Sequence, residues 1–170
     1  ITVPQERVAT NNQTHYMANV ENEDGKLEML RTIFKKTMTG QVFIFCNRIH
    51  KIDMIERAVS EMGIAVSSMH SQKEQDERNR IVEEFRANRI KVLITTDVLA
   101  RGFDTIAELV INYDIPMEAE NYIHRAGRVG RFGTQGSVIN LILNSDKQLF
   151  SNIASKYSIN VLRMNQFLSK

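Results

Sequence analysis

The chain lacks the features that mark secreted and membrane proteins. Its 170 residues include one cysteine, Cys46, which excludes an internal disulfide and favours a reducing compartment. No stretch approaches the roughly 20 apolar residues of a membrane-spanning helix, and the longest apolar run, at 138–143, is interrupted by Asn140. The first residues do not show the basic-then-apolar pattern of a secretion signal. We therefore expect a soluble protein of the cytoplasm, the nucleus or both, with no membrane partner.

A strong excess of charge of one sign is absent too. The net charge is +2, with 25% charged and 42% hydrophobic residues, as in ordinary globular proteins. A role in binding nucleic acid must therefore come from local clusters of basic residues rather than from the total charge. The length fits one domain that buries a sizeable core.

Strand-like and helix-like segments alternate along most of the chain. Residues 1–12 are polar and are expected to be a linker from a missing N-terminal domain, with one domain at 13–170. The predicted strands cover 13–20 (an edge strand), 42–46, 64–69, 91–95, 109–113, 137–143 and 159–162. The predicted helices cover 26–38, 52–62, 72–88, 118–128 and 145–157, the last opened by Ser145 and Gln148 in capping-box spacing. This alternation predicts an α/β fold, a mostly parallel sheet with helices on both faces.

Four polar segments directly follow predicted strands, at 47–51, 70–78, 96–104 and 114–116. The carboxyl ends of parallel strands meet at one edge of a sheet, which is where such folds bind ligands. We therefore expect all four segments to gather at that edge.

A cluster of arginines stands without a nearby counter-charge. No acidic residue occurs between positions 120 and 146, yet the segment HRAGRVGR at 124–131 holds Arg125, Arg128 and Arg131. These arginines need an external anion or a distant carboxylate. In a continued helix Arg128 and Arg131 would share one face. The competing interpretation from composition alone is a solvated basic loop, and the edge rule does not place this segment because it follows a helix.

This segment fills every fixed position of the pattern H-R-x-G-R-x-G-R, the sixth helicase motif. Further matches follow the same order and spacing: VFIFCNR at 42–48, HSQKEQDER at 70–78, TTDVLARGFD at 95–104 and VINYDIP at 110–116. On these segments the chain resembles the C-terminal RecA-like domain of DEAD-box ATP-dependent RNA helicases, a three-layer sandwich. The histidine that opens the sixth motif favours the RNA-acting branch. The wording is closest to translation-initiation and mRNA-export members.

The resemblance implies roles on the nucleotide side. Arg128 and Arg131 would be arginine fingers on the γ-phosphate of ATP, and His124 would couple the nucleotide site to the RNA-bound closed state. A satisfied core histidine is the alternative for His124, and a helix or turn cap is the alternative for the aspartate at 104. The other roles would be Asp104 on the ribose hydroxyls, a tight turn at Gly102, and interdomain contacts by Arg101 and Arg125.

The resemblance also implies contacts with RNA. Thr96 would bond a backbone phosphate, and Gln75 and Arg78, in Q-x-x-R spacing, would anchor the strand nearby without reading its sequence. The alternative for Arg78 is pairing with acidic residues on its own helix. His70, Ser71 and Arg48 would also lie on the RNA side. Two of these positions depart from the family pattern, since Ser71 stands where glycine is usual and Arg48 where threonine is usual.

The chain contains neither a G-x-x-x-x-G-K-[ST] phosphate loop nor a D-E-A-D tetrad. In the family both belong to the N-terminal RecA-like domain, which would hold ATP and Mg²⁺, so we expect no metal site on this chain and no ATP turnover by it alone. The expected partners are RNA, that domain and a helical-repeat scaffold protein. Two other functions are open: an RNA clamp that has lost hydrolysis, and a DNA-directed helicase.

Overall fold

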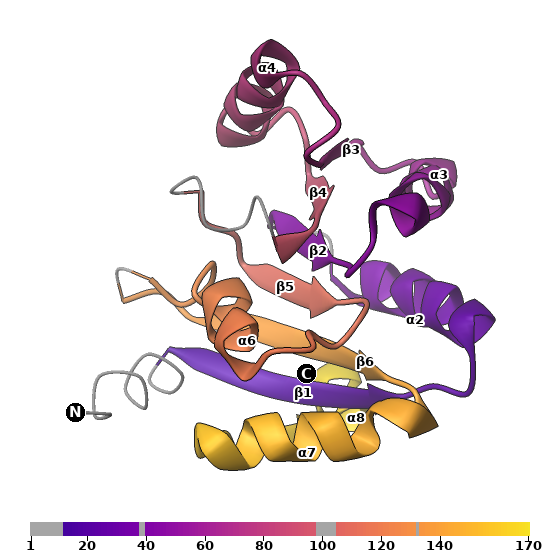
Figure 1. The fold of residues 1–170 in the computed structure, drawn as a ribbon, viewed down its shortest axis with the longest axis vertical. Helices are drawn as coiled ribbons and strands as arrows, with labels where there is room; N and C mark the ends of the chain where they lie inside the picture. Colours follow the sequence, from indigo (N-terminus) through magenta and orange to yellow (C-terminus); the bar gives the residue numbers. More distant parts are fainter. Residues whose placement is uncertain (1–11, 38–39, 98–104, 132) are drawn as a thin grey trace.

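The computed structural model describes residues 12–37, 40–97, 105–131 and 133–170, in which strands and helices alternate (Figure 1). Three of the expected site residues, Arg101, Gly102 and Asp104, lie outside the described residues, as does most of the expected linker.

The strands form one seven-stranded sheet in the order β3-β4-β2-β5-β6-β1-β7, and every strand pair among the described residues is parallel. This confirms the predicted parallel α/β sheet. The strands are β1 (Gln13–Asn19), β2 (Val42–Phe45), β3 (Val66–Met69), β4 (Val92–Thr95), β5 (Leu109–Asn112), β6 (Gly136–Ile142) and β7 (Val161–Arg163).

The strand at 13–20 was expected to be an edge strand, and this expectation is wrong. β1 pairs with β6 on one side and with β7 on the other. Its mixed polar composition suggested an exposed edge, but its polar His15 is buried, with Nδ1 2.8 Å from the hydroxyl of Tyr122. A satisfied hydrogen bond lets this polar side chain lie inside the domain.

Helices cover both faces of the sheet, which completes a three-layer sandwich. One face carries α2 (Glu23–Lys36), α3 (Ile52–Glu61) and α8 (Met164–Leu168), and the other carries α4 (Gln75–Arg86), α6 (Ala119–Ala126) and α7 (Lys147–Lys156). Short 3₁₀ turns, η1 (Ile49–Lys51) and η2 (Asn144–Asp146), precede α3 and α7. Each helix buries an apolar stripe, such as Leu30 and Ile33 of α2 or Ile81 and Phe85 of α4.

Several helix ends differ from the predictions, and at two helix beginnings local hydrogen bonds explain the difference. The side chain of Asn22 accepts a hydrogen bond from Gly25 N at 2.9 Å, so α2 begins at Glu23 rather than at residue 26. Before α7, the carboxylate of Asp146 accepts from Leu143 N at 3.0 Å. The capping box expected from Ser145 and Gln148 is therefore wrong.

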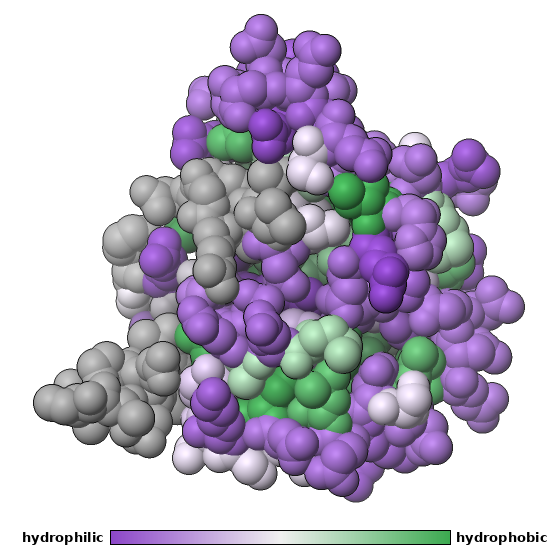
Figure 2. Space-filling model, in the orientation of Figure 1, coloured by the Kyte–Doolittle hydropathy of each residue, from purple (hydrophilic) through white to green (hydrophobic). Residues whose placement is uncertain are grey.

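The surface seen in Figure 2 is largely hydrophilic, with a compact hydrophobic area between α6 and α7. Large hydrophobic side chains are exposed singly, at Met54, Ile106 and Met117. Across the described residues no helix is both long and apolar enough to cross a bilayer.

Candidate functional site

The parallel register brings several strand ends to one edge of the sheet. Thr95, the last residue of β4, aligns with both Phe45 of β2 and Met69 of β3, and Asn112 of β5 also aligns with Phe45. The polar segments after these strands therefore begin side by side. This confirms the predicted gathering at one edge for the parts of the segments that the structure describes.

A buried carboxylate, Asp114, organises this carboxyl edge. Its Oδ1 accepts hydrogen bonds from Lys26 Nζ at 3.0 Å and Lys51 Nζ at 2.9 Å, and its Oδ2 accepts from the backbone N–H of Asn47 at 2.9 Å. Burial alone would raise the pKa of Asp114, but the Asn47 amide and the two lysines outweigh it and hold the pKa below its ordinary value. Partial burial lowers the pKa of Lys51, but its carboxylate partners outweigh this and raise it.

Arg125, the first arginine of the 124–131 segment, is wholly buried at the same edge, with 0% exposure. Its Nε and Nη2 donate to the two carboxylate oxygens of Asp97 at 2.6 and 2.7 Å. Its Nη1 donates to Asn112 Oδ1 at 3.1 Å and to the carbonyl of Asp114 at 2.7 Å, and Nη2 also donates to Asn47 Oδ1 at 2.8 Å. These bonds use all five donors of a guanidinium.

The expected interdomain contact of Arg125 is therefore wrong. The distant carboxylate that the sequence called for is Asp97, which lies 28 positions earlier in this same domain. A side chain with no exposed surface and no unused donor cannot reach another domain. Arg125 instead joins α6 to the segments that follow β2, β4 and β5.

The arginine turn, residues 126–131, lies at the opposite, amino edge of the sheet. α6 runs in the direction opposite to the strands and ends at Ala126. The turn therefore lies beside the beginnings of β1 and β5. The side chain of Gln13 donates to the carbonyls of Ala126 at 2.8 Å and Val129 at 3.2 Å, and Ala107 N donates to the carbonyl of Arg128 at 2.8 Å. Because α6 ends at Ala126, the helix does not continue through Arg128 and Arg131, and the condition under which they would share a helical face is not met.

The two remaining arginines of the turn differ in burial. Arg128 is 8% exposed, whereas Arg131 is exposed. No carboxylate of the described residues lies within ion-pair distance of Arg131, and its carbonyl accepts from Thr134 N at 3.1 Å. Arg131 is thus a guanidinium on a well-anchored backbone that is available to an external anion.

His124 is not a satisfied core histidine. Its side chain is 37% exposed and its Nε2 lies 3.8 Å from Glu120 one turn earlier in α6. Its Nδ1 is buried and finds no hydrogen-bond partner among the described residues. This nitrogen can take part in a contact from outside the described residues.

Gln75 and Arg78 are brought together, as their spacing predicts. Arg78 Nη2 donates to Gln75 Oε1 at 2.9 Å in the first turn of α4, just beyond the carboxyl end of β3. Arg78 bonds this amide rather than an acidic residue of its helix, so the alternative of acidic pairing is not what the structure shows. Its Nε is buried without a described partner.

The other expected RNA-side residues also lie at the carboxyl edge. Thr96 follows β4 and is 5% exposed, while Arg48 and Ser71 are exposed. His70 Nδ1 accepts from Gln72 N at 3.3 Å, and burial together with Lys73 lowers the pKa of His70.

Sequence reasoning missed the residues that hold this edge together, Lys26, Asn47, Asp97 and Asp114. Three of them directly follow buried strands, inside segments already singled out as polar, so their position was visible. Their pairings were not, because each partner lies 28 to 88 positions away. Lys26 resembled an ordinary polar residue of a helix.

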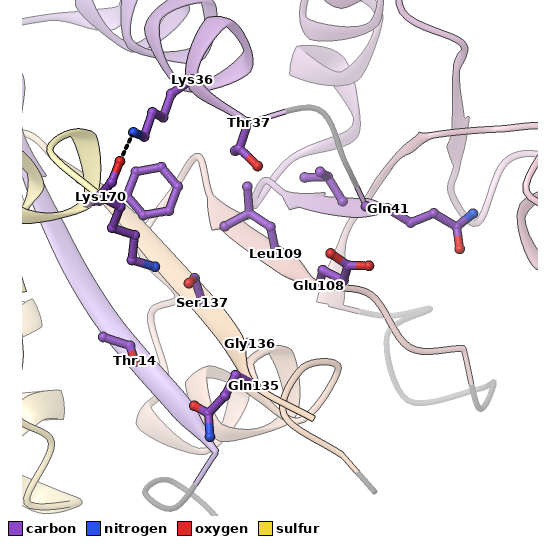
Figure 3. Close-up of a pocket in the computed structure, with 13 residues that line it drawn as sticks. Thr14, Lys36, Thr37, Gln41, Glu108, Leu109, Gln135, Gly136, Ser137 and Lys170 are labelled. Atoms are coloured by element: carbon purple, nitrogen blue, oxygen red, sulfur yellow. Dashed lines mark hydrogen bonds between the residues drawn. The ribbon is translucent and has the colours of Figure 1, made fainter. Parts of the chain in front are cut away.

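A cavity of about 480 Å³ opens at the amino edge, away from these segments (Figure 3). Its polar lining includes Lys36, Gln41, Glu108, Ser137 and Lys170, with Lys36 Nζ donating to the carbonyl of Lys170. None of the expected site residues lines it.

Comparisons with known proteins identify the family of this chain. Residues 25–133 match the helicase conserved C-terminal domain family. Over 162 residues the chain is 41% identical to ATP-dependent RNA helicase FAL1 of Vanderwaltozyma polyspora, covering 95% of this chain and 41% of that protein. It is 43% identical over 150 residues to eukaryotic initiation factor 4A of Dictyostelium discoideum, covering 88% of this chain and 37% of that protein. The chain thus spans about two fifths of the length of these relatives.

Solved structures show the same fold. The C-terminal domain of the DEAD-box protein Dbp5 superposes with a TM-score of 0.84 at 31% identity, covering 89% of each chain. Saccharomyces cerevisiae Dbp5 bound to RNA and ADP BeF3 gives a TM-score of 0.85 at 31% identity, covering 94% of this chain and 43% of that one. The chain therefore belongs to the helicase conserved C-terminal domain family, as a C-terminal RecA-like domain of the DEAD-box type.

Proposed function

We propose that this chain is the C-terminal half of an ATP-dependent RNA helicase, which supplies arginine fingers for ATP hydrolysis and part of an RNA backbone clamp. The family and the relatives named ATP-dependent RNA helicases support this reading. The observation that carries this proposal is that the three arginines of the 124–131 segment have different surroundings. Arg125 is fully bonded inside the domain, whereas the exposed Arg131 lies on a turn whose backbone is held by Gln13 of β1 and by Ala107 just before β5.

On the nucleotide side, Arg131 and Arg128 would reach the γ-phosphate of an ATP held mainly by a preceding domain. The exposed guanidinium of Arg131, without a described counter-charge, fits an anionic ligand. Phosphoryl transfer depends on charge stabilisation, for which an arginine finger contributes on the order of 10³ or more in rate. ATP supplies the transferred phosphoryl group, and its Mg²⁺ would be held by the preceding domain.

The remaining nucleotide-side roles are proposed from the family resemblance. Asp104 would accept from the ribose hydroxyls beside the turn at Gly102, and Arg101 would contact the preceding domain. His124, with its buried and unsatisfied Nδ1, would respond to closure of the two domains.

On the RNA side, the Gln75–Arg78 pair and Thr96 would contact the sugar-phosphate backbone. Their shared location just beyond β3 and β4 supports a strand path along the carboxyl edge. Arg48, His70 and Ser71 would border the same path. Such contacts do not read base sequence, so the proposed local duplex unwinding would not depend on the sequence of the RNA. A protein partner, such as a helical-repeat scaffold, would act on the full-length protein in the cytoplasm or nucleus.

The test is RNA-stimulated ATP turnover by the full-length protein. Arg131→Ala and Arg128→Ala are each expected to lower turnover by on the order of 10³, whereas Arg31→Ala, which removes an exposed arginine of α2, should leave it unchanged. Normal turnover in both finger variants, with a folded protein by circular dichroism, would refute the role of the arginine turn. RNA binding without any turnover in the unmodified protein would support a clamp that has lost hydrolysis.

A further inference from the structure

Two asparagines lie in the interior of the sheet, where the sequence has otherwise apolar runs. Asn112 of β5 and Asn140 of β6 are both 0% exposed and are direct partners in the parallel register. A buried amide without partners is destabilising, so two buried asparagines, one at the end of β5 and one inside β6, call for a specific use.

The asparagines form a hydrogen-bonded chain from Arg125 to β1. Arg125 Nη1 donates to Asn112 Oδ1 at 3.1 Å, and Asn112 Nδ2 donates to Asn140 Oδ1 at 2.8 Å. Asn140 Nδ2 then donates to the Tyr122 hydroxyl at 3.0 Å and to the carbonyl of Tyr16 at 2.9 Å. No step of this chain reaches solvent.

The direction of this chain is fixed at both ends. A guanidinium only donates, so Asn112 must turn its oxygen toward Arg125. A backbone carbonyl only accepts, so Asn140 must turn its nitrogen toward Tyr16. Both constraints leave Asn112 Nδ2 facing Asn140 Oδ1, as observed, which makes the amide orientations mutually consistent.

Tyr122 and Arg125 are three positions apart, on the same face of α6. The chain of hydrogen bonds therefore fastens α6 to the sheet at two points, one on β5 and one on β6. A rotation of α6, or a slide by one residue, would break the hydrogen bonds at both points and leave buried polar groups unpaired. The arginine turn begins directly after this fastened segment.

We propose that Asn112, Asn140 and Tyr122 are positioning residues that set the register of α6 and thereby the location of the arginine turn relative to the carboxyl edge. Because α6 runs between the two edges, the same residues fix the position of the arginine turn relative to the RNA-side segments. The effect on turnover rests on the proposed function, whereas the effect on α6 does not.

The test compares Tyr122→Phe with Tyr113→Phe in the full-length protein. Both remove one buried hydroxyl, but that of Tyr113 finds no partner among the described residues. Tyr122→Phe removes the buried hydrogen bonds of its hydroxyl to Asn140 and His15. It should lower kcat for RNA-stimulated ATP turnover by about threefold to tenfold, with KM for RNA within about twofold. Tyr113→Phe should leave kcat unchanged. Asn140→Leu should lower kcat further.

Hydrogen exchange separates positioning from general destabilisation. In the Tyr122 and Asn140 variants, amides of residues 119–131 should exchange faster while those of α2 keep their rates. Equal acceleration throughout, or no change in residues 119–131, would overturn the proposal, as would normal kcat in both variants. If the unmodified protein shows no turnover, the proposed function fails and the exchange measurement alone decides the inference.

Discussion

At the residue scale, Lys26 is a buried charged residue that depends on its ion-pair partners. Its side chain is 2% exposed and forms ion pairs with Asp114 at 3.0 Å and Glu23 at 3.2 Å. Its ammonium also lies 5.0 Å from the ring centroid of Tyr113. A buried ammonium is tolerated only when it is paired. The Asp114 carboxylate therefore holds the beginning of α2 against the end of β5.

Asp114→Asn is expected to lower the free energy of unfolding by about 3–5 kcal/mol, because it leaves the Lys26 ammonium buried beside a neutral amide. Glu23→Gln removes the more exposed partner of the same lysine and should cost about 1 kcal/mol or less. Urea unfolding of both variants measures the difference. Equal costs would show that Asp114 is not the essential counter-charge.

The lowered pKa of Asp114 also predicts a pH dependence. A carboxyl whose pKa is lower in the folded than in the unfolded state stabilises the fold above its unfolded pKa, about 3.9. This contribution is lost as the pH falls through the folded pKa. Unfolding midpoints from pH 7 to pH 2 should therefore fall more steeply below about pH 4 in the unmodified protein than in Asp114→Asn. Parallel curves would contradict the assignment.

At the scale of the element, α6 and the arginine turn form one unit that is held at both edges of the sheet. Arg125 ties the helix to the carboxyl edge, and Gln13 and Ala107 hold the carbonyls of the turn at the amino edge. Gly130 then approaches the chain just before β1, where a Cβ atom would lie 2.4 Å from the carbonyl oxygen of Asn12. The path of the turn depends on this close approach.

Gly130→Ala is expected to destabilise the protein by more than Gly63→Ala. Both glycines have positive φ, +73° and +81°, and share a left-handed penalty of about 1–2 kcal/mol. Only Gly130 has backbone in the space of the added methyl group, whereas Gly63 has no atom within 4 Å. Thermal unfolding of both variants measures the excess, and equal shifts would mean that the turn accommodates a side chain.

At the scale of the whole molecule, the proposed site residues lie at two opposite edges of the sheet, which α6 joins. The RNA-side residues gather beyond β2, β3 and β4, and the arginine turn lies near the beginnings of β1 and β5. The chain spans about two fifths of its curated relatives, and its sequence has no phosphate loop. Under the proposed function, each edge would be a partial site that a second domain completes.

The isolated 170-residue chain is expected to show no RNA-stimulated ATP turnover, because it supplies the arginines without a phosphate cradle. The full-length protein under the same conditions is the control. The measurement is phosphate release with and without a single-stranded RNA. Turnover by the chain alone at a rate comparable to the full-length protein would refute the half-site interpretation.

The sequence by itself determined the parallel α/β fold, because periodic apolar segments and the polar residues that end them are local signals. It also determined the family, through motifs whose residues are contiguous. The location of the RNA-side segments followed from the rule that parallel strands end at a common edge.

Only the tertiary structure decided what the individual polar residues do. It shows that β1 lies inside the sheet and that α6 ends before Arg128. It also shows that Arg125, which was expected to contact another domain, is buried and bonded within this one. The physical reason is that a buried charge or amide is defined by its partners. Those partners come from strands and helices far apart in the chain, and folding alone brings them together.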